Sequence, residues 1–250
     1  NVYDRNSFAD TSKAMIPYEE FINKELIHFS KYDCDRSIPN LMDGLKISLR
    51  KILYCAFKKR LTTEIKVAQF SGYVSENSGY HHGEASLNAA IVGMAQNFVG
   101  SNNINLFMPN GQFGTRLQGG KDSASERYIY TLLTRITRCI FPAEDDNVLQ
   151  YLDDDGTIVE PIYYAPIIPM ILVNGTQGIG TGFSTYIPNF KLQDITEWFK
   201  NKLTGKKKEE LKPYYEGFKG RIIKFDDTTW VSEGICEVND NKVIIKVNQN

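Results

Sequence analysis

The sequence contains no long apolar run. No stretch of its 250 residues approaches the roughly 18 to 20 consecutive apolar residues that a membrane-spanning helix needs. The first residues, Asn-Val-Tyr-Asp-Arg, do not have the pattern of a signal peptide. We therefore expect no membrane partner.

Cysteine is also scarce. The cysteines lie far apart and none has C-x-x-C spacing, which excludes a zinc ribbon and a dense disulfide framework; they are Cys34, Cys55, Cys139 and Cys236. We expect free thiols in a reducing compartment.

The motifs that would bind a metal or a nucleotide are incomplete. His82-Gly-Glu84 has the H-x-E form of zinc deaminases, but the P-C-x-x-C motif that they also need is absent. The glycines of residues 178–182 are followed by Phe-Ser-Thr-Tyr-Ile-Pro and not by a helix, so a tight connection at a domain corner is favoured over a dinucleotide site. The acidic runs 144–146 and 153–155 lack EF-hand spacing, which favours solvated loops. We predict no metal site.

The composition supplies a core, and the charge is unevenly distributed. Hydrophobic residues make up 42% of the chain and aromatic residues 12%, while the net charge is -1. Residues 46–66 carry seven basic side chains against Glu64 alone, and residues 141–160 carry seven acids and no base. The basic stretch fits either a phosphate-binding face or a solvated helix face, and charge alone does not decide between them.

Apolar spacing predicts two helices and a glycine-rich loop. Residues 41–60 have the apolar stripe of a helix, on which Lys46 and Arg50, four residues apart, would share one side. A second helix follows the His-His-Gly-Glu stretch, runs over residues 87–98 and would stop at Gly100. The pair is typical of a helix-turn-helix relative, and the loop 110–121 comes next.

A third helix is expected to contain Tyr128. Ser123-Ala-Ser-Glu126 fits a capping box, and apolar residues then recur at 129, 132, 133, 136 and 140. This pattern places Tyr128 in the first turn or two, near the positive end of the helix, and Pro142 at its end.

The rest of the chain indicates a second domain, with a boundary near residue 168. Residues 167–173 predict a buried strand, followed by an Asn174-Gly175 turn. An amphipathic helix is expected near residues 192–203, followed by a charged linker. Strands are expected at residues 220–225 and 242–247.

Tyr128 is one of fourteen tyrosines, and its neighbours distinguish it. Arg127 precedes it, and Arg116 and Lys121 lie a few residues upstream. A tyrosine hydroxyl with a pKa of about 10 becomes a nucleophile when positive charge favours the phenolate, and the same charge neutralises a phosphate. Phosphoryl transfer to Tyr128 is one hypothesis. A DNA-binding protein without catalysis and a protein scaffold are the alternatives.

Several motifs in one order resemble a known family. They are Arg36-Ser-Ile-Pro, Asp43-Gly-Leu-Lys46, Arg50-Lys-Ile-Leu53, Tyr80-His-His-Gly-Glu84, Gln96-Asn-Phe-Val-Gly-Ser-Asn-Asn103, Gly111-Gln-Phe-Gly-Thr-Arg116, Gly119-Gly-Lys-Asp-Ser-Ala-Ser125, Arg127-Tyr128 and residues 169–182. Over most of residues 15–190 the chain resembles eukaryotic-type, type IIA DNA topoisomerase II. Bacterial gyrase and topoisomerase IV have different blocks around the histidines and the tyrosine.

The resemblance implies an α+β fold and a set of site residues. The expected order is a connecting segment at residues 1–28, a CAP-like winged-helix domain at 29–168 and the start of an α/β tower domain at 169–250. Tyr128 would form a 5′-phosphotyrosyl link to DNA, Arg127 would hold the scissile phosphate, and Ile179 would wedge between base pairs. The other expected DNA contacts are Arg36, Lys46, Arg50, His81, His82, Arg116 and Lys121.

The resemblance also implies partners and cofactors for the whole enzyme. These are double-stranded DNA, a homodimer, and Mg²⁺ and ATP bound outside this chain, which alone should cleave DNA poorly. The location would be nuclear, or a viral replication site if the source is a large DNA virus. Two positions depart from the family pattern: Glu126 replaces a common proline and is interpreted as the capping residue, and Phe183 replaces a frequent tryptophan.

Overall fold

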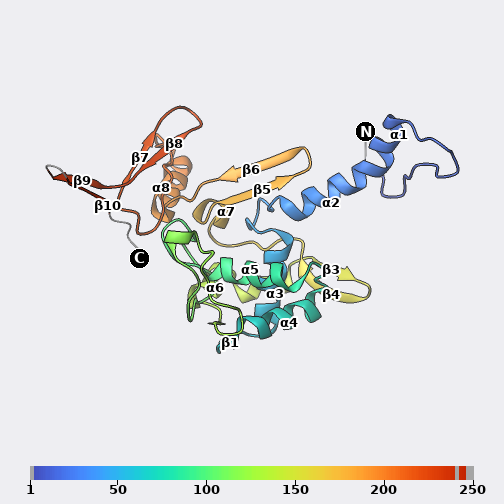
Figure 1. Cartoon of the computed structure of the whole chain (residues 1–250), viewed down its shortest axis with the longest axis horizontal. Helices are drawn as coiled ribbons and strands as arrows, with labels where there is room; N and C mark the ends of the chain where they lie inside the picture. Colours follow the sequence, from blue (N-terminus) through green and yellow to red (C-terminus); the bar gives the residue numbers. More distant parts are fainter. Residues whose placement is uncertain (1–2, 240–241, 246–250) are drawn as a thin grey trace.

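The core of the chain is helical. The structure is a computed structural model that describes residues 3–239 and 242–245. In it, three helices pack against one another: α3 (Ile47–Lys58), α4 (Val67–Ser78) and α5 (Glu84–Ala95) (Figure 1). The apolar stripe of the first predicted helix is buried, with Ile52, Leu53 and Ala56 fully inside. Each large apolar side chain buried in this way contributes about 1.5–3 kcal/mol.

The helix ends are set by local geometry. Gly79 follows α4 with φ 58°, the left-handed conformation that stops a helix and that glycine adopts without strain. The predicted stop of the next helix at Gly100 is wrong, because α5 ends at Ala95. The helix ends there because Gln96 turns to an extended conformation (φ -58°, ψ 135°).

Small antiparallel sheets lie at the edges of the core. β1 (Ile65–Lys66) pairs with β2 (Tyr130–Thr131), and β3 (Tyr151–Asp154) forms a hairpin with β4 (Thr157–Pro161). The end of β4 is buried and packs against α3. The acidic loop before β3 contains η3 (Ala143–Asn147).

The predicted helix that begins at Ser123 is wrong. Residues 126–128 form a turn, β2 follows, and the helix α6 spans only Arg135–Ile140. The backbone pairs with distant segments instead: Tyr130 N donates to Asn110 O (2.9 Å) and Leu133 N to Leu61 O (3.0 Å). The expected capping box is also absent from this turn, where the Ser125 hydroxyl donates to the Glu126 carboxylate at 3.3 Å.

The predicted strand at residues 167–173 is wrong as well. The apolar run contains a one-turn helix, α7 (Met170–Val173), which starts directly after Pro169. A short buried apolar run fits a strand or a helix equally, and proline is favoured at a helix start. The chain bends at Asn174 between α7 and β5, and Gly175 is required there, since it has φ 62° and a Cβ would lie 2.5 Å from the Ile187 carbonyl oxygen.

The glycine-rich run forms one strand of a hairpin. β5 (Thr176–Gly180) pairs with β6 (Phe183–Ile187), with Ile179 opposite Ser184. Gly178 and Gly180 allow β5 to pack against α2 (Ile27–Ser37), because a Cβ on Gly178 would collide with Ser37 O and a Cβ on Gly180 would lie only 3.1 Å from Cys34 Sγ. The expected tight connection is therefore a strand in close contact with a helix.

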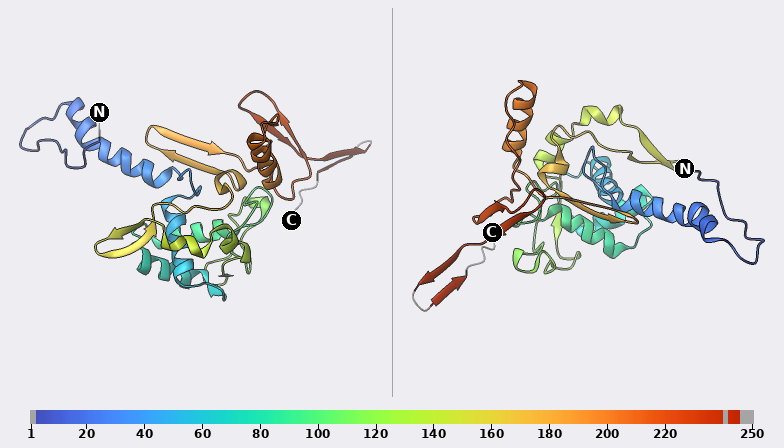
Figure 2. Two further views of the ribbon diagram at one scale, coloured as in Figure 1. Left: turned by 180° about the vertical axis from the view of Figure 1, so that it is seen from behind. Right: turned by 90° about the horizontal axis from the view of Figure 1, so that it is seen from above.

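The C-terminal part consists of a helix and two hairpins. The predicted helix is confirmed as α8 (Leu192–Leu203). The hairpin of β7 (Arg221–Lys224) and β8 (Trp230–Glu233) confirms the first predicted strand, and β9 (Cys236–Asn239) pairs with β10 (Lys242–Ile245). The second predicted strand is confirmed up to residue 245, and its residues 246–247 lie outside the described residues. These hairpins extend away from the helical core (Figure 2).

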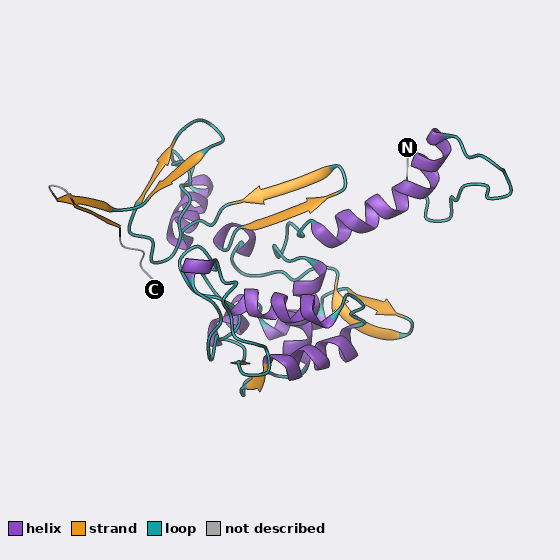
Figure 3. Cartoon of the chain, in the orientation of Figure 1, coloured by secondary structure: helices purple, strands orange, loops and turns teal. Residues whose placement is uncertain are grey.

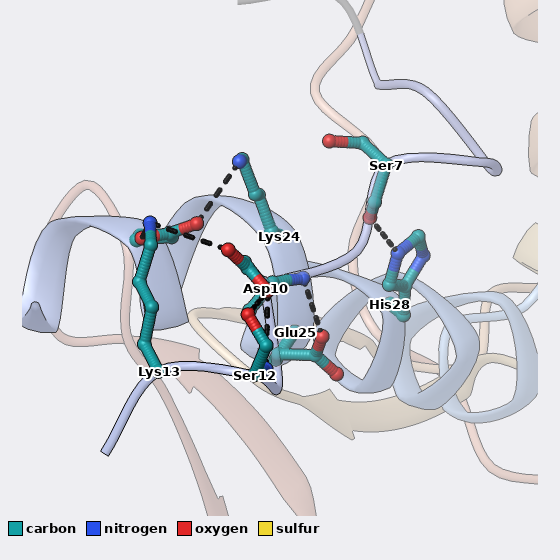
Figure 4. A network of polar contacts seen from close by, with 9 residues as sticks. Ser7, Asp10, Ser12, Lys13, Lys24, Glu25 and His28 are labelled. Carbon is teal, nitrogen blue, oxygen red and sulfur yellow. Dashed lines mark hydrogen bonds and ion pairs between the residues drawn. The ribbon is translucent and has the colours of Figure 1, made fainter. Parts of the chain in front are cut away.

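The N-terminal part is an extended helical rod. α1 (Tyr18–Phe21), η1 (Ile22–Leu26) and α2 follow one another without a break and point away from the core (Figure 3). The preceding loop folds back onto this rod: Ala9 N donates to the Glu25 carboxylate (2.8 Å), and His28 Nε2 lies 2.8 Å from Ser7 O (Figure 4). The expected boundary after residue 28 falls inside α2, and the division into domains stays a prediction. None of the helices in the described part is long and apolar enough to cross a membrane.

Candidate nucleic-acid interface

Four of the predicted DNA-contacting residues line one cavity. Arg36, Lys46, His81 and His82 border a space of about 700 Å³ between α2, the start of α3, the α4–α5 loop and the β3–β4 hairpin. We call this space the basic cleft. Its other walls carry Lys51, which the sequence did not single out, and the acids Asp153, Asp154 and Glu160.

Lys46 reaches the cleft from a loop and not from a helix. Gly44 N donates to Asn40 O (2.8 Å), and Asn40 N donates to Leu45 O (3.0 Å), which closes the loop before α3. Gly44 has φ 71°, and a Cβ there would lie 2.8 Å from the Ile171 backbone. Lys46 itself is extended (φ -74°, ψ 160°) and immediately precedes the first turn.

The predicted common face of Lys46 and Arg50 is wrong. Arg50 is buried, with 4% of its surface exposed. Its guanidinium forms a bidentate ion pair with Asp43, at 2.7 Å from Nε to Oδ2 and 3.1 Å from Nη2 to Oδ1. Asp43 is fully buried and also accepts hydrogen bonds from Leu45 N and Tyr164 N, both at 2.9 Å. Because Lys46 lies outside the helix, the four-residue spacing does not align the two side chains. Arg50 would have to leave Asp43 to contact DNA.

Lys51 takes the place in the cleft that the spacing predicts for Arg50. Its ammonium donates to the Glu160 carboxylate at 2.8 Å and to Ser78 O. The Lys51 side chain is 13% exposed and that of Glu160 is 2% exposed. The signal that could have found Lys51 is its position in α3, five residues after Lys46, once the helix start is placed at Ile47.

The histidines differ in their surroundings. His81 is exposed, with Nε2 4.0 Å from the Asp154 carboxylate. His82 is partly buried, and its Nε2 lies 3.0 Å from the Tyr32 hydroxyl. Burial lowers the pKa of His82, and the nearby charges of Arg36, His81 and Lys51 lower it further. A phosphate in the cleft would oppose these effects, since an anion favours the imidazolium form.

Tyr128 projects from a firmly anchored turn. Its side chain is 77% exposed, and Arg127 beside it is also exposed. Tyr128 N donates to Ser125 O (2.9 Å), and Ala68 N donates to Glu126 O (3.1 Å). The next residue, Ile129, is 1% exposed. The backbone on both sides of Tyr128 is therefore fixed while its hydroxyl faces solvent.

A second cavity lies beside this turn. It has a volume of about 650 Å³ between α5 and residues 119–127, and Lys121 and Arg127 line it. The N-terminal turn of α5 borders both cavities, with Ser86 at the basic cleft and Glu84 at the second cavity. The two groups of predicted residues therefore lie on either side of one helix end.

The loop before Tyr128 is held by side-chain hydrogen bonds. The Gln96 amide donates to Phe113 O (2.8 Å) and Gly120 O (3.2 Å), and Asp122 accepts from Thr115 N (2.8 Å) and the Thr115 hydroxyl (2.7 Å). Arg116, in η2 (Arg116–Gln118), lies 5.6 Å from the centre of the Phe218 ring. The structure thus separates Arg116 from Lys121 and Arg127, which share a cavity.

Ile179 lies at the exposed face of the β5–β6 hairpin. Its side chain is 71% exposed. In an antiparallel pair, opposite residues point to the same side, so Ile179 and Ser184 share the face opposite to the glycines that contact α2. A large apolar side chain with this exposure is available to a partner.

The cysteines and the candidate metal ligands complete the description of the reactive side chains. Cys34, Cys55, Cys139 and Cys236 are free thiols, and burial raises the pKa of Cys55 to about 12. Within residues 3–239 and 242–245, no group of three or more His, Cys, Asp or Glu side chains is arranged to hold a metal ion.

Sequence comparison identifies the family. The family model for the A-type subunit of DNA gyrase/topoisomerase IV matches residues 36–249. The chain belongs to this family. It is 54% identical over 234 residues to DNA topoisomerase 2 of Arabidopsis thaliana, and 52% identical over 229 residues to DNA topoisomerase 2-alpha of Gallus gallus. These matches cover 94% and 92% of this chain but 16% and 15% of the relatives, so the chain spans about a sixth of their length.

A solved structure agrees with the sequence comparison. A crystal structure of the Plasmodium falciparum topoisomerase II DNA-binding, cleavage and re-ligation domain superposes with a TM-score of 0.85 and 50% identity. The match covers 94% of this chain and 32% of that one. The resemblance inferred from the motifs is confirmed, and the mixture of helices and strands is that of a topoisomerase II cleavage domain.

Proposed function

We propose that this chain is the part of a type II DNA topoisomerase that binds double-stranded DNA and carries the residue that breaks and rejoins it. The observation that supports this most is the exposed Tyr128 beside Arg127, on a turn anchored by the buried Ile129. In this proposal residues 29–168 are the winged-helix domain and residues 169–250 begin the tower domain.

The proposed reaction exchanges one phosphodiester bond for another. The Tyr128 hydroxyl loses its proton and its oxygen bonds to a DNA phosphorus, the bond from phosphorus to the 3′ oxygen breaks, and that oxygen takes up a proton and leaves as a hydroxyl, so no proton is gained or lost overall. The product is a 5′-phosphotyrosyl link. Because it retains the energy of the broken bond, the reverse attack reseals the strand without an external energy source.

In this proposal the basic residues and Ile179 contact different parts of the DNA. Arg127 would hold the scissile phosphate, since a guanidinium matches phosphate geometry with two hydrogen bonds. Arg36, Lys46, His81, His82 and Lys121 would contact the backbone of the duplex. Ile179 would enter the minor groove between base pairs and bend the DNA.

Strand passage would need further groups that are supplied by the whole protein. Strand passage would use ATP and Mg²⁺ bound outside this chain and a homodimer that places two tyrosines on opposite strands. The eukaryotic relatives favour a nuclear location, and a viral replication site is the alternative for a large DNA virus. This chain alone should form a covalent link with DNA poorly, because in this proposal the Mg²⁺ that assists cleavage is bound elsewhere in the whole protein.

The test compares two tyrosines that are two residues apart. In the full-length protein that contains this chain, supercoiled DNA, Mg²⁺ and detergent trapping should give a protein-linked double-strand break. Tyr128→Phe should abolish this product without loss of DNA binding. Tyr130→Phe, in β2 and 37% exposed, is the matched control and should retain it.

Two other results would reject parts of the proposal. An adduct that persists in Tyr128→Phe would show that the nucleophile is a different residue. DNA binding without an adduct in the parent protein would favour a winged-helix protein without catalysis.

A further inference from the structure

One asparagine side chain connects three segments that are far apart in the sequence. The Asn103 amide donates to Val173 O (2.9 Å), Phe190 O (3.2 Å) and Tyr214 O (3.1 Å). Its carbonyl oxygen accepts from Glu216 N at 2.9 Å. An asparagine side chain has two N–H donors and one carbonyl oxygen, so both ends of this amide are in use.

Two further asparagines, Asn174 and Asn189, form hydrogen bonds to the segment that contains Asn103. Asn174 accepts from Ile104 N (2.9 Å) and donates to Ile104 O (2.7 Å), while the Asn189 amide donates to Ser101 O (2.9 Å). We call Asn103, Asn174 and Asn189 the asparagine cluster. Its contacts lie just before β5 and just after β6, so the cluster holds both ends of the β5–β6 hairpin to residues 101–104.

Residues 101–104 are fixed in turn to α5. The Asn102 amide donates to Gly93 O and Gln96 O, both at 2.8 Å, at the C-terminal end of that helix. The Gln96 side chain holds the loop that leads to Tyr128. A continuous set of hydrogen bonds therefore runs from the base of the hairpin to the helix and the loop beside the tyrosine.

Hydrogen bonds at the base of the hairpin are suited to fixing its orientation. Apolar packing is non-directional, whereas a hydrogen bond weakens steeply when its angle changes. The hairpin lies above the core, and its far end reaches away from α7 (Figure 1). A small rotation at its base would therefore displace Ile179 by more than it moves the cluster.

We infer that Asn103 is a positioning residue that sets the angle of the β5–β6 hairpin, and thus the place of Ile179, relative to α5 and the Tyr128 turn. The inference rests on the proposed function, in which Ile179 meets duplex DNA. Asn103 itself touches neither of the cavities described above. Its loss should reduce DNA bending while the basic cleft still binds phosphates.

The experiment measures bending and binding separately on the full-length protein that contains this chain. A duplex with a fluorescent donor and acceptor at its two ends reports the bend at saturating protein, and a titration at several salt concentrations gives Kd and its salt dependence. Asn103→Ala should lose most of the energy-transfer change while its salt dependence stays that of the parent. Asn77→Ala is the matched control, because the Asn77 amide donates only to Tyr73 O (3.0 Å) within α4, away from the hairpin and the asparagine cluster, and this variant should bend DNA normally.

The outcomes separate this inference from the proposed function. If the full-length parent neither binds nor bends the duplex, the proposed function fails. If the parent bends DNA and Asn103→Ala bends it equally, or if Asn77→Ala loses the bend to the same extent, the positioning role is wrong. Should Asn103→Ala fail to fold, Asn189→Ala removes one hydrogen bond from the same cluster and must show a partial loss of bending.

Discussion

The basic cleft and the Tyr128 turn hold their functional groups in different ways. In the cleft, basic side chains lie beside acids, with Lys51 2.8 Å from Glu160 and His81 Nε2 4.0 Å from Asp154. At the turn, Arg127 and Tyr128 extend into solvent from a backbone that is fixed by hydrogen bonds and by the buried Ile129. In the cleft, acidic side chains therefore neutralise part of the basic charge. At the turn, the fixed backbone holds Arg127 and Tyr128 in place while their side chains remain exposed.

This difference bears on the proposed reaction. A cation that is already paired gains less from a phosphate than one that is exposed, because part of its charge is neutralised beforehand. The cleft is suited to guiding the duplex, and the turn is suited to strong contact with a single phosphate. Three predictions test this division, from the largest expected effect to the smallest.

The largest effect concerns the support of the cleft. Asp43→Ala leaves the Arg50 guanidinium buried without its partner, which should cost about 3–5 kcal/mol of unfolding free energy. Lys46→Ala, three residues away at the cleft, removes a solvent-accessible charge and should change stability by less than about 0.5 kcal/mol. Urea denaturation of both variants measures the difference. Equal stabilities would mean that the buried pair is not the support of the loop before α3.

That pair also shows what the sequence could not provide. The spacing of Arg50 from Lys46 fits one helical turn and predicts a DNA-facing side chain, yet the helix begins after Lys46. The partner of Arg50 is Asp43, in the preceding loop, and Tyr164 completes the site from more than a hundred residues away. Spacing identifies neighbours within a helix, but it cannot show where the helix begins or which charge is neutralised inside.

The region around Tyr128 illustrates the same limit for the fold. Residues 129–140 have helical apolar spacing, but Ile129 and Thr131 are buried and Tyr130 is exposed, the alternation of a strand. Pairing with residues 61–66 and 106–110 decides the outcome, and these partners are distant in sequence. By contrast, the predicted and observed ends of α8 agree, because its amphipathic pattern depends on local spacing.

The motifs predict much of the candidate site. Arg36, Lys46, His81 and His82 come from three separate motifs, and they border one cavity. The sequence could not reveal that Lys51 pairs with Glu160, since this pairing depends on the contact between α3 and β4.

The second prediction compares one cation from each region. Lys46→Ala and Arg127→Ala should each lower the slope of log K against log salt by about 0.9, the value for one phosphate contact to B-DNA. At saturating DNA, only Arg127→Ala should reduce the covalent product of the full-length protein. Arg221→Ala, on β7 and paired with Glu233 at 2.9 Å, is the control and should change neither quantity. A loss of product in Lys46→Ala at saturation would contradict the division between guiding and reaction.

The smallest effect is a pH dependence of DNA binding by the cleft. The pKa of His82 is lowered from 6.5 by burial and then by neighbouring cations, so the imidazole is neutral near pH 7 in the protein alone. A phosphate would raise that pKa in the complex, and binding would then take up a proton. Affinity should therefore rise as the pH falls through the bound-state pKa and level off below the lowered pKa of the unbound protein.

His82→Gln separates this contribution from the other groups of the cleft. The groups around the ring are Tyr32, Tyr80, Arg36, His81 and Lys51. The other histidine that lines the cleft is His81, so His81→Gln is the matched control. Kd measured between about pH 8 and pH 5.5 should vary by about two- to tenfold in the parent, since one unit of pKa shift corresponds to a tenfold change. The variation should shrink in His82→Gln and persist in His81→Gln; the reverse pattern would assign the proton uptake to His81 and contradict the role given to His82.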